Sequence, residues 1–255
     1  MFDGLKAFIH HGNRYIPDPT KVKLPENFSG LPVISTNPCK QDCQLCVQAC
    51  PTKAIRKSPL TLSLDSCIFC LECQEICPEH KIQFSNEYKM GTNIYERLQI
   101  KEGYSNSISI EPSIVRSEII RILGRSLKLR LVSAGSCNGC ELELNAAGNV
   151  NFDMGRYGIE FVASPRHADG LVITGPIAEN SLASVRLTYE AIPEPKIVVL
   201  VGACALSGGL FKQSPALRRE IINELKPDLL VPGCPPHPLT FINAVLDLLR
   251  AKENK

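Results

Sequence analysis

Residues 67–78 read CIFCLECQEICP, so four cysteines and a proline follow the spacing C-x2-C-x2-C-x3-C-P. This spacing is typical of iron–sulfur ligands, because short turns bring several thiolates to one face. A similar run, CKQDCQLCVQACP at residues 39–51, precedes it. The final cysteines of the two runs, Cys50 and Cys77, lie 27 residues apart. We interpret the pair as an internal repeat in which each copy is too small to bury a core alone.

The twelve cysteines of the chain fall into three groups of four, with none left over. The groups are Cys39, Cys43, Cys46 and Cys50; Cys67, Cys70, Cys73 and Cys77; and Cys137, Cys140, Cys204 and Cys234. This count predicts three 4Fe–4S clusters and makes electron transfer the leading function. Disulfides are the alternative for a cysteine-rich secreted chain, and the spacing favours metal instead.

The first run departs from the pattern, since three residues separate Cys39 from Cys43 where two are usual. One interpretation is a relaxed loop that still holds a normal 4Fe–4S cluster. The alternative is that Cys39 does not bind, which leaves three cysteines and favours a 3Fe–4S cluster. We favour the intact cluster, because Pro38 can tighten the approach and no other cysteine is spare.

Length and composition limit the remaining function classes. The 255 residues suffice for one large domain or two modest ones, and 44% of them are hydrophobic. The net charge of +2 gives no bulk electrostatic basis for nucleic-acid binding. No apolar run approaches the roughly 18 residues of a membrane span. We expect no secretory leader, because Met1–His11 contains Asp3 and lacks a long apolar core.

The second half of the chain alternates between two kinds of pattern. Apolar, β-branched runs predict buried strands at 127–133, 159–163, 171–174, 197–201 and 229–231. Helical patterns lie at 141–147, 181–191, 216–225 and 239–251. The alternation predicts an α/β domain with a doubly wound, flavodoxin-like parallel sheet.

The last four cysteines follow the ends of three predicted strands. Cys137 and Cys140 come after strand 127–133, Cys204 after 197–201 and Cys234 after 229–231. Since ligands of such sheets bind at the carboxyl ends of the strands, we expect these cysteines to converge. A C-x2-C pair also serves zinc, so zinc with four thiolates is the alternative here.

Residues 38–86 closely resemble bacterial two-cluster ferredoxins, which are small α+β domains. In that family the fourth cysteine of each run binds the other cluster. The resemblance implies a first ligand set of Cys39, Cys43, Cys46 and Cys77. It implies a second ligand set of Cys67, Cys70, Cys73 and Cys50. We call Cys137, Cys140, Cys204 and Cys234 the third ligand set.

Five ordered motifs carry a second resemblance. They are SCNGCELE (136–143), SPRHAD (164–169), GAC (202–204), SGG (207–209) and PGCPP (232–236). Together they resemble the small subunit of energy-converting nickel–iron hydrogenases and the related twenty-kilodalton subunit of complex I. The two-residue spacer between Cys137 and Cys140 looks like the hydrogenase branch. The resemblance implies one 4Fe–4S cluster in this domain, proximal to the catalytic site of a separate large subunit.

Other residues of these motifs have predicted roles. The resemblance implies that Glu141 faces the large subunit and relays protons; the alternative is an exposed glutamate in the first turn of a helix. Arg166 and His167 are expected in a loop beside the cluster, where a cation would raise the reduction potential of the cluster. The alternative for His167 is an ordinary loop residue. The small residues are interpreted as letting backbone N–H groups approach the cluster, rather than as a phosphate cradle; they are Gly202, Ser207, Gly208, Gly209 and Gly233.

We divide the chain into an arm (1–37), the two-cluster ferredoxin domain (38–86), a linker (87–111) and the hydrogenase-small-subunit-like domain (112–255). The apolar residues of 2–9 follow helical spacing, which suits a partner subunit or, less so, lipid. The proline-rich remainder of the arm is expected to wrap a partner. Residues 112–125 are expected to be helical, with basic surroundings from Arg116 to Arg130 that favour a solvated face over lipid headgroups.

The chain is therefore expected to be an electron-transfer subunit of a membrane-associated, multi-subunit oxidoreductase. Its expected partners are a catalytic large subunit, membrane-embedded subunits and, as donor, a soluble ferredoxin or formate dehydrogenase. Its expected place is the cytoplasmic face of the cell membrane, held there through these partners. The large subunit favoured by the resemblance is a nickel–iron hydrogenase of the hydrogenase-3/4 or formate hydrogenlyase type. The alternatives are a quinone- or sulfur-linked relative without nickel, and a stand-alone ferredoxin-type carrier.

Overall fold

Five strands form one parallel sheet, because their apolar, β-branched runs can be buried on both faces. They are β6 (Leu127–Ser133), β7 (Ile159–Phe161), β8 (Gly170–Thr174), β9 (Ile197–Val201) and β10 (Leu229–Val231). Their order is β10-β9-β8-β6-β7, and all neighbours are parallel. This is the flavodoxin-like order, with its switch point between β6 and β8. The predicted fold class of the second half is confirmed.

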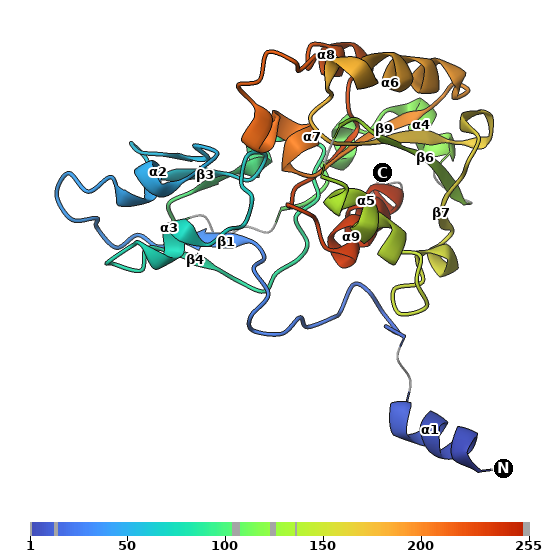
Figure 1. Ribbon diagram of the computed structural model, residues 1–255, viewed down its shortest axis with the longest axis horizontal. Helices are drawn as coiled ribbons and strands as arrows, with labels where there is room; N and C mark the ends of the chain where they lie inside the picture. Colours follow the sequence, from blue (N-terminus) through green and yellow to red (C-terminus); the bar gives the residue numbers. More distant parts are fainter. Residues whose placement is uncertain (1, 13–14, 104–107, 123–125, 136, 252–255) are drawn as a thin grey trace.

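The protein is described from a computed structural model (Figure 1). The described residues are 2–12, 15–103, 108–122, 126–135 and 137–251. Arg125, among the basic residues around the predicted helix 112–125, and Ser136, the first residue of the motif SCNGCELE, lie outside these ranges.

Helices cover both faces of the sheet (Figure 1). They are α5 (Gly139–Ala146), α6 (Glu179–Ala191), α8 (Ile221–Leu225) and α9 (Pro238–Arg250). Alternation along β8 divides its side chains between two cores. Ile173 belongs to the same core as Val185 of α6, whereas Val172 belongs to the same core as Phe241 of α9. The sheet is therefore a buried middle layer, which leaves the ends of its strands for a site.

The cysteine-rich part contains two small antiparallel sheets and two short helices. The pair β1 (Pro32–Ile34) and β4 (Ile82–Phe84) forms one sheet, and β2 (Ile55–Arg56), β3 (Thr61–Ser63) and β5 (Gln99–Lys101) form the other. The helices are α2 (Leu45–Ala49) and α3 (Glu72–Glu75). In each copy of the repeat, a helix leads to a cysteine–proline pair and then to a strand that begins with a buried isoleucine, Ile55 or Ile82.

The segment 87–111 is more than the predicted linker, because it joins both parts of the chain. It contains a 3-10 turn, η1 (Tyr95–Leu98), and β5, which pairs with β3. Thr92 exchanges two backbone hydrogen bonds with Leu230 at the edge strand β10, with N–O distances of 3.1 and 2.8 Å. Leu98 and Ile100 are fully buried. Residues of the cysteine-rich part and of the α/β part consequently share one core.

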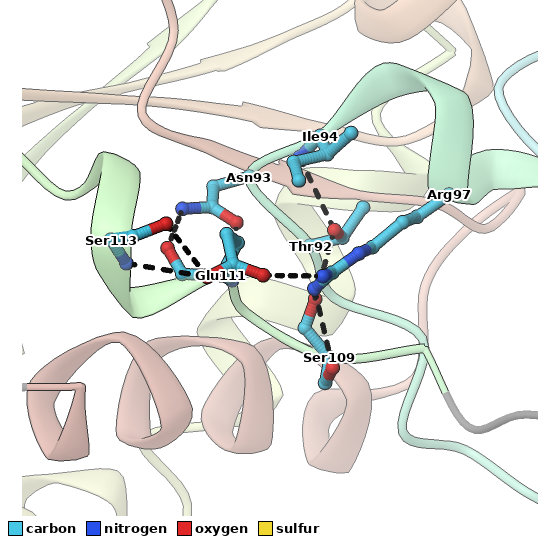
Figure 2. A network of polar contacts seen from close by, with 7 residues as sticks. All are labelled: Thr92, Asn93, Ile94, Arg97, Ser109, Glu111 and Ser113. Atoms are coloured by element: carbon cyan, nitrogen blue, oxygen red, sulfur yellow. Dashed lines mark hydrogen bonds and ion pairs between the residues drawn. The ribbon is translucent and has the colours of Figure 1, made fainter. Parts of the chain in front are cut away.

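Polar contacts join the two ends of the same segment (Figure 2). The guanidinium of Arg97 pairs with the carboxylate of Glu111 at 2.6 Å and donates to the carbonyl oxygen of Ser109 at 2.9 Å. Asn93 donates to the carbonyl of Glu111 at 2.9 Å and accepts from the amide of Glu111 at 2.7 Å. Such reciprocal bonds hold the two ends of the segment beside one another.

The N-terminal helix α1 (Asp3–His11) stands apart from the rest of the chain (Figure 1). Apolar side chains of α1 and of the preceding residue are exposed, with Phe2, Phe8 and Ile9 at 68%, 68% and 70%. The arm after α1, which we expect to wrap a partner, makes contacts with this chain at Pro19. The carbonyl of Pro19 accepts hydrogen bonds from both Tyr88 and Asn243, at 2.8 and 2.9 Å.

Two predicted helices differ in the structure. Over residues 112–122 of the helix predicted at 112–125 there are η2 (Pro112–Ile114) and α4 (Ser117–Ile122), and residues 123–125 lie outside the described ranges. Between η2 and α4, Arg116 forms an ion pair with Asp228 at 2.9 Å, so this part of the basic surroundings is paired rather than free. The helix predicted at 216–225 is only α8, because the backbone of residues 216–218 bonds to residues 177–179 instead.

The remaining short elements are η3 (Met154–Tyr157), η4 (Pro165–His167), α7 (Ala203–Ser207) and η5 (Gly209–Phe211). Over the described ranges, every helix is too short or too polar to cross a bilayer.

Candidate metal centres

The first ligand set lines a single cavity. Cys39, Cys43 and Cys46 from the first run meet Cys77 from the second run there. Leu60, Pro78, Lys81 and Ile82 are among the other residues that line this cavity. Burial, ahead of the charges of the other three cysteines, raises the pKa of Cys46. The four sulfurs thus lie near enough to sense one another, in the crossed grouping that the ferredoxin resemblance implies.

The second ligand set lines a second cavity of similar size. It contains Cys67, Cys70, Cys73 and Cys50, and its empty volume of about 310 Å³ matches the roughly 290 Å³ of the first cavity. Burial and the charges of neighbouring cysteines raise the pKa values of Cys67 and Cys73 to about 12. A buried thiol with such a pKa stays protonated at neutral pH unless a metal takes the place of its proton.

A hydrogen bond to sulfur is repeated in the two copies. The amide of Ala54 donates to Cys50 Sγ at 3.2 Å, and the amide of Lys81 donates to Cys77 Sγ at 3.3 Å. Both bonds span four residues and follow the cysteine–proline pair. Because N–H donors to cluster sulfurs raise the potential of a bound cluster, the duplicated bond suits this use.

The third ligand set gathers at the carboxyl ends of β6, β9 and β10. Burial, followed by Glu141 and the charges of the other three cysteines, raises the pKa of Cys140 to about 12. Cys137 and Cys234 are exposed, whereas Cys140 is buried. The expected convergence of the three loops is thus present, and the set opens to the surface on the side of Cys137 and Cys234.

Glycines make room for two of these sulfurs. A Cβ atom on Gly202 would lie 2.6 Å from Cys140 Sγ, and one on Gly209 would lie 3.2 Å from Cys204 Sγ. Gly208 and Gly233 are needed for close backbone packing within their loops, since a Cβ atom on Gly208 would meet Lys212 and one on Gly233 would meet Pro236. Ser207 accepts a hydrogen bond from the amide of Gly209 at 3.2 Å, so it shapes the same loop.

Glu141 is buried, not the exposed first-turn residue that was its alternative. It lies in the first turn of α5 with 6% of its surface exposed. The hydroxyl of Thr174, at the end of β8, donates to its carboxylate at 2.6 Å. It also lines an open cavity with Arg130 and Asn145. The carboxylate therefore lies between the third ligand set and a polar surface hollow.

Arg166 and His167 occupy η4 and are exposed. Neither is among the charged groups that shift the pKa values of Cys140 and Cys204. The cation that does act there is Arg219, which lowers the pKa of Cys204 against the larger effect of burial. Its guanidinium donates to the carbonyls of Cys204, Ala205 and Leu206, each at 2.9 Å. No sequence motif contains Arg219, so sequence reasoning missed it.

The second ligand set lies near the first and near the third. The charge of Cys46 in the first set raises the pKa of Cys73 in the second, after burial and the charges of Cys50 and Cys70. The charge of Cys70 in the second set raises the pKa of Cys234 in the third, after burial and the charge of Cys137. The second ligand set is therefore the neighbour of both others.

The donor chemistry of the three sets fits iron–sulfur clusters, since each offers four cysteine sulfurs, the ligands that such clusters take. In the described parts of the chain, no three or more His, Cys, Asp or Glu residues lie close enough to hold a single metal ion.

Comparison with known proteins matches residues 137–248 to the family "NADH ubiquinone oxidoreductase, 20 Kd subunit". The chain is 42% identical over 130 residues to a probable membrane-bound hydrogenase subunit, mbhJ, of Pyrococcus furiosus, which covers 51% of this chain and 78% of that one. It is 35% identical over 150 residues to formate hydrogenlyase subunit 7 of Escherichia coli, covering 58% and 59% of the two chains.

A third relative is an NADH-quinone oxidoreductase subunit of Citrifermentans bemidjiense, 41% identical over 109 residues, with 43% and 64% of the chains covered. Among solved structures, the membrane-bound sulfane sulfur reductase, an archaeal respiratory membrane complex, has a chain that matches with a TM-score of 0.44 and 27% identity, over 56% of this chain and 77% of that one. The expected family is confirmed: through its α/β part, the chain belongs to the family of the twenty-kilodalton subunit of NADH ubiquinone oxidoreductase, whose members are subunits of oxidoreductase complexes.

Proposed function

We propose that the chain is an electron-transfer subunit in which three ligand sets hold three 4Fe–4S clusters in a row. The single observation that carries the proposal is the gathering of all twelve cysteines into three adjacent quartets. When bound, such clusters supply one-electron transfer at potentials that the protein adjusts. The chain itself fixes the order, because the second ligand set neighbours both the first and the third.

The first ligand set is the proposed entrance or exit for an external partner. It lies at the end of the row away from the α/β part, and the loop over it contains exposed polar residues such as Gln41 and Asp42. A polar rim suits transient docking of a soluble donor, of which a ferredoxin or a formate dehydrogenase is the proposed kind.

The third ligand set is the proposed contact with the catalytic large subunit. Cys137 is exposed there, and apolar side chains surround the same loops. Leu142 of α5 is 60% exposed, and Leu210 and Phe211 beside Gly209 are 58% and 45% exposed. Exposed apolar residues around a functional site favour a protein interface. Membrane-embedded subunits would then hold the assembly at the cytoplasmic face of the membrane.

We propose that the large subunit is a nickel–iron hydrogenase. The support is the likeness to the hydrogenase subunit mbhJ and to formate hydrogenlyase subunit 7, together with the two-residue spacer between Cys137 and Cys140. The likeness to the NADH-quinone oxidoreductase subunit, at 41% identity, favours a quinone-linked complex without nickel as the second candidate.

Anaerobic affinity purification of the complex tests this choice. The hydrogenase proposal expects a co-purifying large subunit with two C-x2-C pairs, stoichiometric nickel and hydrogen-dependent reduction of the chain. A large subunit without nickel and with quinone-dependent turnover would establish the second candidate. Isolation of the chain alone, loaded with iron and without any partner, would favour a stand-alone carrier.

Glu141 is the proposed proton relay at the large-subunit interface. Its burial beside the third ligand set and its position on a polar hollow with Arg130 support this role. Glu141→Gln in the assembled complex is expected to slow turnover while iron content stays unchanged. Thr174→Val, which removes only the hydroxyl that donates to this carboxylate, serves as the control and should act more weakly. Full turnover of Glu141→Gln would reject the relay.

A further inference from the structure

The two copies of the repeat differ at one position beside the crossing cysteines. Lys81 in the second copy corresponds to Ala54 in the first, at the common offset of 27 residues. Both amides donate to the crossing sulfur, as described above. Both carbonyls also accept from a serine amide, Ser63 for Ala54 at 2.8 Å and Ser35 for Lys81 at 2.9 Å. The backbones are thus equivalent, and only the side chain distinguishes the positions.

The side chain of Lys81 is buried at the first ligand set. Only 3% of it is exposed, and the residue lines the cavity of that set. Its ammonium donates to Glu102 Oε1 at 2.6 Å and to the carbonyl oxygen of Asn37. A buried ammonium is costly unless paired and hydrogen-bonded, so these bonds satisfy it where it lies.

Asn37 lies two residues before Cys39, the cysteine with the widened spacing. In the second ligand set the corresponding segment is fixed locally: the amide of Cys67 donates to the carbonyl of Ser63 at 3.0 Å, and the hydroxyl of Ser66 donates to the carboxylate of Asp65 at 3.1 Å. Among the described residues 35–39, Cys39 makes no matching bond to Ser35. Pro38 has no amide hydrogen to contribute. The hydrogen bond from the ammonium of Lys81 to Asn37 therefore takes the place of the backbone bond that the segment before Cys39 lacks.

We propose that Lys81 is the positioning residue of the first ligand set. Its buried ammonium fixes the segment Asn37-Pro38-Cys39 and thereby keeps Cys39 as the fourth ligand. This inference rests on the proposed function, because it takes a cluster at the first ligand set as given. It favours the intact 4Fe–4S cluster over the alternative that the sequence left open, a 3Fe–4S cluster without Cys39.

A second consequence follows from charge. Lys81 lines the cavity, whereas the side chain of Glu102 is 31% exposed and partly screened by water. The first ligand set therefore has a buried ammonium beside it that the second, with Ala54, lacks. A cation favours the more reduced, more negative state, so the potential at the first set is raised relative to a variant without the ammonium.

The test compares Lys81→Met, Lys81→Arg and Lys196→Met in the full chain, purified without oxygen. Lys196 is the matched control, since it is another buried lysine, bonded to the carbonyls of Tyr189 and Ile192 in the α/β part. The readouts are iron per chain, the electron paramagnetic resonance spectrum after mild oxidation, and a reductive titration of each signal.

Lys81→Met is expected to lose one iron of about twelve and to gain a three-iron signal from the first set alone. Lys81→Arg should largely keep the fourth iron of the first set, and Lys196→Met should keep all of the iron of the wild-type chain. Full iron and an unshifted first-set potential in Lys81→Met would overturn the inference. So would a wild-type chain with about eleven irons and a three-iron signal, since Cys39 would then be unbound despite Lys81.

Glu102→Gln keeps the test decisive if Lys81→Met does not fold. It leaves the bond from Lys81 to Asn37 and removes only the partner charge, so four irons at the first set and a raised potential are expected there. Loss of iron or an unmoved potential would contradict the inference. A wild-type chain with no cluster at the first set would instead defeat the proposed function.

Discussion

The guanidinium of Arg219 donates a 2.9 Å hydrogen bond to the carbonyl oxygen of Cys204, a member of the third ligand set. It also holds the carbonyls of Ala205 and Leu206 at the same distance, so one side chain closes the end of α7. These carbonyls belong to a short helix and need such a donor. Arg219 thus fixes the loop that presents Cys204 and adds a positive charge beside it.

Arg219→Met is expected to lower the free energy of unfolding by about 3 kcal/mol, since it leaves buried carbonyls without a charged donor. It should also lower the potential of the cluster at the third set, because a cation near it is lost. Denaturant titration and a reductive titration measure the two effects. Arg186→Met, which removes an exposed ion pair with Glu224, is the control and should change stability by less than about 1 kcal/mol. If the two variants had equal effects, Arg219 would have no special role in holding the loop of Cys204 or in raising the potential there.

Gly202→Ala is expected to empty the third ligand set. The added methyl group would lie 2.6 Å from Cys140 Sγ, at a residue whose φ of +89° disfavours a side chain. Iron should fall from about twelve to about eight per chain, with the signals of the first two sets unchanged. Gly4→Ala, where a Cβ atom meets nothing within 4 Å, is the control. Retention of all iron in Gly202→Ala would show that the loop has more room than the structure gives it.

The crossed grouping predicts that the last cysteine of each run binds the cluster of the other run. Cys50 lies in the first run but lines the second cavity, and Cys77 lies in the second run but lines the first. Cys50→Ala should therefore abolish or alter the signals of the second set, and Cys77→Ala those of the first. Spectra of the two variants, referenced to Cys46→Ala for the first set, decide the matter. If Cys50→Ala matched Cys46→Ala instead, the ligands would not cross.

His237 gives a pH dependence to the stability of α9. Its Nδ1 accepts from the amide of Leu239 at 3.2 Å as the cap of that helix, and it packs edge-on against Phe28 and Phe152. Burial lowers its pKa below the usual value of 6.5. A lowered pKa means that the stabilisation is complete above about pH 6.5 and is lost as the pH falls through the folded-state value.

We expect the free energy of unfolding to decrease by about 1 kcal/mol between pH 7.5 and the acid side of that transition, the contribution of one helix cap. His237→Asn keeps a capping acceptor without a titrating ring, so it should flatten this pH dependence. Denaturant midpoints over the pH range measure both proteins. An identical slope for wild type and His237→Asn would assign the effect to other groups.

The parallel sheet could be predicted closely because its strands are buried on both faces. The runs at β6, β9 and β10 have the predicted bounds, since nothing in them competes with burial. The helix expected at 216–225 failed in its first half, where backbone bonds to residues 177–179 prevail over local helical propensity. The segment around Thr92 looked like a linker because its pairing partner, Leu230, is remote in the sequence.

The cysteine quartets came from two other sources: the resemblance to two-cluster ferredoxins implies the crossed first and second sets, and the positions of the last four cysteines after predicted strand ends indicate the third set. The supporting residues could not be predicted. Arg219 and Lys81 act through bonds to backbone carbonyls that belong to distant loops, and carbonyls leave no mark in a sequence. The buried Glu141 of α5 accepts a hydrogen bond from Thr174 at the end of β8, a partner that no local pattern indicates.

The central claim is that three quartets of thiolates hold three redox-active clusters. The most direct measurement is the count of iron and acid-labile sulfide per chain in protein purified without oxygen. The account predicts about twelve of each. Zinc in place of iron, or about four irons or fewer with the remaining cysteines in disulfides, would contradict it.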